Sequence, residues 1–105
     1  MLLPSHKFIV ESYSGMKTTP DNKHKYIEIV LRKPAPTNEF GEKFMDDDIF
    51  QASVWNKSAE ELPVFNHGDK VEALLALKGT KELSTTDNRT YFRYQFSIRK
   101  ISKID

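Results

Sequence analysis

Histidines and aspartates are the side chains of this sequence that could do catalytic or metal chemistry. His6, His24 and His67 are scattered along the chain, without the spacing of a metal-binding pair. The run from Asp46 to Asp48 could contact a hard cation, but neighbours on an extended chain point in alternating directions. The sequence has no cysteine, no glycine-rich phosphate loop, no Gly-x-Ser-x-Gly elbow and no HExxH helix. We therefore expect no enzyme activity, no cofactor and no metal site.

The charged side chains are unevenly distributed along the 105 residues. The formal net charge is only +1, but residues 34–48 contain five acids and a single lysine. Pro34, Pro36, Asn38 and Gly41 predict that this segment is a long, solvated, mobile loop, and we interpret its acids as keeping the loop soluble. The remainder of the chain is therefore basic. Local charge matters more than the total for a ligand that meets one face.

Alternation of apolar and polar residues predicts five strands. They are residues 7–13, continuing irregularly past Gly15 toward residue 18, then 25–33, 49–55, 70–78 and 91–99. The side chains expected to face the core are Ile27, Ile29 and Leu31, then Phe50, Ala52 and Val54, and finally Phe92, Tyr94, Phe96 and Ile98. Trp55 is in phase with polar residues, and the outer face of the last strand carries Tyr91, Arg93 and Arg99.

The segments between these strands are also informative. Asn56 or Ser58 can cap a short helix after the third strand, which Pro63 limits to one or two turns. The run 70–78 is almost continuously apolar, which suits a strand covered on both sides by that helix or by a partner subunit. The hairpins at residues 14–25 and 79–90 are long, polar and basic. Because they exceed the length of tight turns, we expect them to extend around a ligand.

Five strands with a helix after the third predict one all-β domain, residues 1–105, folded as a five-stranded Greek-key OB barrel. A sandwich needs more strands, and an SH3-like barrel does not normally insert a helix at 57–65. This architecture indicates nucleic-acid binding rather than catalysis. Because the sequence has neither a signal peptide nor an apolar run long enough for a membrane span, we expect a soluble cytoplasmic protein.

From Phe50 to Ile101 the chain resembles the bacterial single-stranded DNA-binding protein family and its small primosomal relatives. The motifs that carry the resemblance are Trp55-Asn56-Lys57, Gly68-Asp69-Lys70-Val71, Lys78-Gly79 and the alternating run from Tyr94 to Ile101. They cover about half of the chain, and residues 1–49 depart from the family pattern. The resemblance implies binding of single-stranded DNA with little sequence preference, in support of replication, recombination or repair.

The resemblance also implies how such binding would work. Aromatic rings stack on exposed bases, while Lys and Arg contact phosphates and displace counterions. The stacking candidates are Tyr13, Tyr26, Trp55 and Tyr91, although a lone Trp at the end of a strand is more often a core lid against the following helix. The phosphate candidates are Lys17, Lys23, Lys25, Arg32, Lys57, Lys81, Arg89, Arg93 and Arg99.

Several partners are compatible with these features. Single-stranded DNA is the expected ligand, RNA is a second possibility, and no membrane is expected. The apolar fourth strand and open sheet edges favour a homo-oligomer, either a dimer or a tetramer. The near-zero net charge and the acidic loop leave open a different class of function, a protein-binding OB module that acts as an assembly adaptor without nucleic acid.

Overall fold

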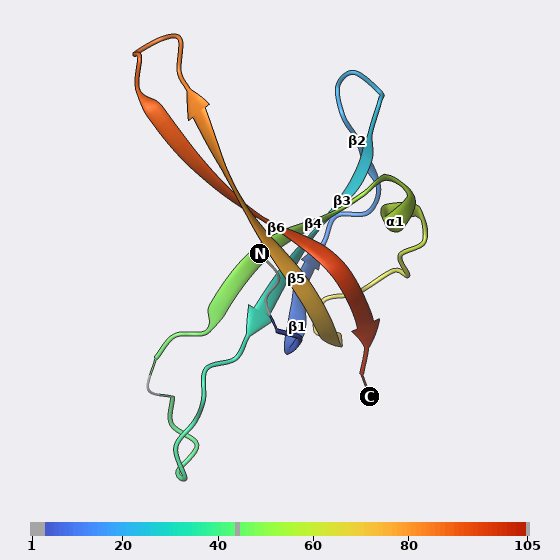
Figure 1. Cartoon of the computed structure of the whole chain (residues 1–105). Helices are drawn as coiled ribbons and strands as arrows, with labels where there is room; N and C mark the ends of the chain where they lie inside the picture. The colour runs from blue at the N-terminus through green and yellow to red at the C-terminus, as the bar shows by residue number, and fades with distance from the viewer. Residues whose placement is uncertain (1–3, 44, 105) are drawn as a thin grey trace.

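The structure is a computed structural model that describes residues 4–43 and 45–104. It consists mostly of strands, with one short helix. An all-β fold is therefore confirmed. The elements are β1 (His6–Tyr13), β2 (Lys17–Thr18), β3 (Lys25–Lys33), β4 (Asp48–Trp55), α1 (Asn56–Glu60), β5 (Lys70–Leu83) and β6 (Thr90–Lys103) (Figure 1).

The six strands form one sheet whose hydrogen bonding returns to its starting strand. Their order is β1-β5-β6-β4-β3-β2, and β1 also pairs with β3. All neighbours are antiparallel except β4 and β6, which are parallel and joined only at Ala52 with Phe96 and Ser53 with Ser97. The bonding is thus ring-like, but this narrow junction keeps it from being a clean barrel.

Apolar side chains on the inner faces of the strands fill the centre of the ring. Ile27, Ile29 and Leu31 on β3 are buried, as their alternation predicts. Ala52 and Val54 of β4 are buried beside them on the same face, because they pair with Ile29 and Ile27. The buried cluster comprises Phe8, Val10, Ile27, Ile29, Leu31, Ala52, Val54, Ala59, Phe65, Val71, Ala73, Leu75 and Ile98.

A bulge in β1 changes the phase of that strand. Val10 pairs with Leu31 but Ser12 pairs with Val30, so Glu11 is an extra residue. Tyr13 is therefore directed inward, where its ring packs edge-on against Phe65 with the ring centres 6.3 Å apart. The prediction that Tyr13 lies on the outer face is wrong, because simple alternation does not include the bulge.

The last two strands are longer than predicted and leave the core. β5 and β6 stay paired from Leu77 with Phe96 to Leu83 with Thr90, so only residues 84–89 form the connection. This two-stranded ribbon, residues 79–94, is called here the β5–β6 arm, and Figure 1 shows it projecting from the sheet. Phe92 and Tyr94 lie on the arm and are exposed, so their predicted place in the core is wrong. Their alternation is correct, but no second layer covers this part of the described chain.

The helix also differs from expectation. Trp55 occupies its N-cap position and, among the described residues, no side chain caps it, so the predicted cap by Asn56 or Ser58 is wrong. Asn56 instead has a positive φ of 52°, and its Oδ1 accepts a hydrogen bond from the backbone N–H of Lys25. The helix packs on β3 and β4 rather than over β5. Within the described residues, no helix is long and apolar enough to cross a membrane.

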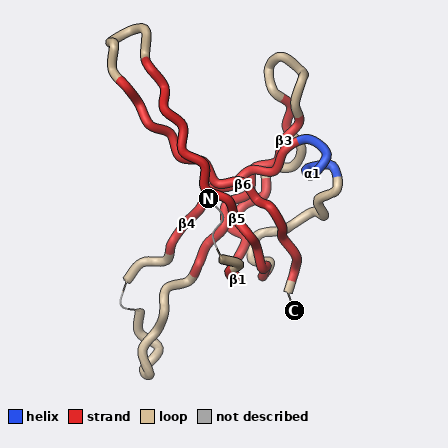
Figure 2. The backbone as a smooth tube through the Cα atoms, in the orientation of Figure 1, coloured by secondary structure: helices blue, strands red, loops and turns tan. Residues whose placement is uncertain are grey.

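Two arms and one loop extend from the sheet. Figure 2 shows the β5–β6 arm and the β2–β3 hairpin rising on one side, while the loop between β3 and β4 extends the other way. That loop is fastened where it joins β4. Asp47 contacts Arg32 and Lys43 at 3.0 and 2.7 Å, and it accepts a hydrogen bond from the backbone N–H of Ala35. The two arms therefore share one side of the molecule, away from the acidic loop.

Candidate functional site

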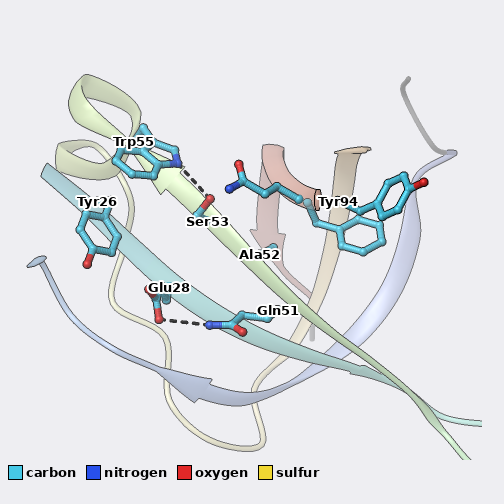
Figure 3. Close-up of a pocket in the computed structure, with 9 residues that line it drawn as sticks. Tyr26, Glu28, Gln51, Ala52, Ser53, Trp55 and Tyr94 are labelled. Atoms are coloured by element: carbon cyan, nitrogen blue, oxygen red, sulfur yellow. Dashed lines mark hydrogen bonds between the residues drawn. The ribbon is translucent and has the colours of Figure 1, made fainter. Parts of the chain in front are cut away.

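A groove of about 360 Å³ lies where β3, β4 and β6 meet. Figure 3 shows Tyr26 and Trp55 at one end of it, Glu28 and Gln51 joined beside them, and the Tyr94 side chain directed away from the pair. The groove follows from the narrow β4–β6 junction, because β6 turns away from β4 on the arm side of Phe96. Its lining residues are Tyr26, Glu28, Gln51, Ala52, Ser53, Trp55, Tyr94, Gln95 and Phe96.

The first end of the groove is a stacked aromatic pair. Tyr26 and Trp55 are directly opposite each other on β3 and β4, and their rings lie 4.9 Å apart at an angle of 27°. The Trp55 indole N–H donates to Ser53 Oγ at 2.9 Å, which holds the ring over the sheet. Trp55 is 43% exposed. Of its two interpretations, the core lid is therefore wrong, and the ring is available at the surface.

Tyr94 borders the groove on β6 and is 70% exposed, with its ring directed away from the Tyr26–Trp55 pair (Figure 3). Its ring lies over Gly79, its partner on β5, where an added Cβ would be 3.2 Å from Tyr94 Cε1. The absence of a side chain at Gly79 thus lets the ring lie close to the strand. The sequence analysis missed Tyr94 as a site residue. A usable signal was the length of the alternating run in β6, which continues well beyond what a small core can cover.

Polar side chains line the groove beside the Tyr26–Trp55 pair. Gln51 Nε2 donates to Glu28 Oε2 at 3.2 Å, and Lys17 Nζ lies 3.5 Å from the same oxygen. Glu28 and Tyr26 are two residues apart on β3, so they share the outer face of the sheet. Sequence reasoning missed both Glu28 and Gln51, because isolated polar residues on an outer strand face look like ordinary surface.

The predicted cations of the first hairpin lie around the Tyr26–Trp55 pair. Lys17 is directly opposite Tyr26 in the β2–β3 pairing, and Lys25 precedes Tyr26. Lys25 Nζ is 3.5 Å from Glu60 of α1, an exposed pair that contributes little to stability. Lys57 follows the pair on α1, and Lys23 is exposed in the turn before β3. Lys17 and Lys25 are therefore next to Tyr26 on the sheet, whereas Lys23 and Lys57 are near the pair only in the sequence.

The predicted residues of the β5–β6 arm form a separate group. Tyr91 and Arg93 line a second hollow near the tip of the arm, together with Phe92. The Tyr91 hydroxyl donates to Asp87, and this bond raises the pKa of Tyr91 and lowers that of Asp87. Arg93 Nε is 3.2 Å from Glu82. Tyr26 thus shares its groove with Tyr94 rather than with Tyr91 and Arg93.

Lys81 and Arg89 are exposed on the same arm, on β5 and in the connecting turn. The backbone N–H of Arg89 donates to Asp87 Oδ1 at 3.0 Å, which helps to close the turn. The arm therefore brings two further cations to the side of the molecule that carries the groove.

Arg32 and Arg99 lie away from the groove. Arg32 is six residues from Tyr26, about 20 Å along the strand. It pairs with Glu11 and Asp47, and these hydrogen bonds, that of Glu11 foremost, raise its pKa. Arg99 lines a hollow beside α1. Arg32 is committed to fastening the acidic loop, so its expected role in the groove is not supported by its position.

The site offers stacking and hydrogen bonding rather than metal chemistry. Within residues 4–43 and 45–104, no three His, Asp or Glu side chains gather as a metal site would require.

No protein-family model matches the chain, and no curated protein matches it either.

Proposed function

We propose that this chain is an OB-fold protein that binds single-stranded DNA in the groove between β3, β4 and β6, without catalysis. Bases stack on Trp55, Tyr26 and Tyr94, and the sugar-phosphate backbone follows the lysines of the first hairpin and the cations of the β5–β6 arm. Such binding is largely tolerant of sequence, because every base offers a flat face to an aromatic ring.

The order of the elements supports the OB assignment. Five strands, β1, β3, β4, β5 and β6, are joined in a ring, and the helix comes after the third of them. An OB fold is a five-stranded, partly open Greek-key barrel of this kind. Its ligands bind across the second and third strands, which correspond here to β3 and β4 and carry Tyr26 and Trp55.

The observation that carries the proposal is the stacked Tyr26–Trp55 pair at the groove, on the outer face of β3 and β4, with Trp55 exposed. Large aromatic side chains are normally buried, and a stacked pair at the surface beside Lys17 and Lys25 is typical of a stacking platform. Each base stacked on such a ring contributes roughly 1–3 kcal/mol, and the lysines add a salt-dependent attraction.

The intrinsic fluorescence of the protein tests this proposal directly, because Trp55 is its one tryptophan. Titration with oligo-dT should quench the emission at low salt, and the apparent affinity should fall steeply as salt is added. An unchanged emission together with an unshifted oligonucleotide in a native gel would overturn the proposed function.

A second function is favoured by one observation on the β5–β6 arm. Leu83 and Phe92 are exposed apolar side chains, Phe92 to 63%, and Arg93 is already paired with Glu82. Such a surface suits a protein partner better than a phosphate backbone. An adaptor of this kind would leave oligonucleotides unbound in the titration above, so the two functions are distinguished by the same experiment.

A further inference from the structure

The middle of the groove holds a carboxylate, which is unexpected where a polyanion is to bind. Glu28 lines the groove two residues from Tyr26, on the same face of β3, and its side chain is 34% exposed. A phosphate placed beside it would be repelled. If the proposed function holds, the bases rather than the backbone must therefore face Glu28.

The hydrogen bonds of Glu28 leave it able to accept another donor. Gln51 Nε2 and Lys17 Nζ both contact Oε2. Of the described residues, none donates a hydrogen bond to Oε1. Because Gln51 gives its amide N–H to Glu28, its own carbonyl oxygen is also turned to accept. Glu28 Oε1 and the Gln51 carbonyl oxygen are thus two acceptors open to a donor on a base that stacks against the Tyr26–Trp55 pair.

We propose that this groove prefers bases that carry an exocyclic amino group, such as cytosine, over thymine; the inference rests on the proposed function. The N4 amino group of cytosine donates to a carboxylate, whereas thymine presents the O4 carbonyl at the same place and has only an N3–H flanked by two carbonyls. Facing Glu28, that carbonyl would be repelled rather than bound. The preference concerns the one base beside Glu28, so the rest of the bound strand stays sequence-tolerant.

Oligo-dC and oligo-dT of equal length provide the test, since both are pyrimidines and differ little in stacking area. Binding is measured by fluorescence anisotropy with labelled oligonucleotides at mildly alkaline pH, where oligo-dC remains single-stranded. The wild type should bind oligo-dC at least about fivefold more tightly than oligo-dT. Glu28→Gln should bring the two affinities to within about twofold, because an amide can either donate or accept.

Glu72→Gln is the matched control. It removes one negative charge from β5, whose residue 72 pairs with Lys7 and Ser102, outside the groove. This variant should keep the wild-type preference for oligo-dC. Equal binding of oligo-dC and oligo-dT by the wild type, or an unchanged preference in Glu28→Gln, overturns the inference and leaves the proposed function standing. Failure to bind either oligonucleotide overturns both.

Discussion

Replacing Tyr94 by alanine distinguishes a role in the core from a role in base stacking. Loss of a core side chain lowers the free energy of unfolding, whereas loss of a stacking side chain lowers the affinity for DNA. Tyr94 is 70% exposed. A tyrosine can bury on the order of 200 Å², so the covered part is about 60 Å² and stabilises the fold by at most about 1.5 kcal/mol. A stacked base is worth roughly 1–3 kcal/mol, or about 5- to 150-fold in affinity. Tyr94→Ala should therefore weaken DNA binding more than it weakens the fold.

The affinity for oligo-dT is measured by fluorescence anisotropy, and stability by thermal unfolding followed with circular dichroism. Phe40→Ala is the control, because Phe40 is 78% exposed, lies on the loop between β3 and β4 and does not line the groove. It should bind as the wild type does. The reasoning is refuted if Tyr94→Ala binds like the wild type, or if Phe40→Ala loses as much affinity. Loss of folding in Tyr94→Ala would show instead that this residue is needed for the stability of the core.

Three further outcomes follow from the described contacts. Gly79→Ala should reduce oligo-dT affinity less than Tyr94→Ala does, because a Cβ 3.2 Å from Tyr94 Cε1 displaces the ring without removing it; anisotropy compares the variants. Lys43, the Ala35 N–H and Arg32 hold the pKa of Asp47 well below its usual value, so its contribution to stability is complete above about pH 4 and is lost as the pH falls. Unfolding temperatures measured from about pH 2 to about pH 7 should therefore decline less on the acid side in Asp47→Asn than in the wild type. Size-exclusion chromatography with light scattering should give a dimer or tetramer, and a monomer at all concentrations would contradict the expected self-association.

The parts of the fold that local alternation determines could be predicted from the sequence. The bounds of β3 and its three inward side chains, Ile27, Ile29 and Leu31, agree with the prediction, since this strand is paired on both sides and buried on one face. The helix after Trp55 was also placed correctly in the chain order. Such features need no knowledge of distant contacts.

The errors come from tertiary context that alternation does not contain. In β6 the residues Phe92 and Tyr94 continue the apolar phase of Ile98, and the sequence alone does not say where the core beneath that face ends. Tyr13 moved inward because of a bulge, which adds one residue without altering the pattern of residue types. Glu28 was missed for a related reason, as its importance depends on which strand lies beside it.

The short parallel contact between β4 and β6 has a consequence for dynamics. Two residue pairs hold this side of the ring, whereas β5 and β6 are paired along their full length. Local opening should therefore begin there, and amides whose hydrogen bonds cross this junction should exchange with deuterium early in the free protein. Ala52 and Phe96 belong both to this junction and to the groove wall. A DNA strand bound across the groove would stabilise this junction. Slower hydrogen exchange at these positions would then detect binding even if the fluorescence of Trp55 did not change.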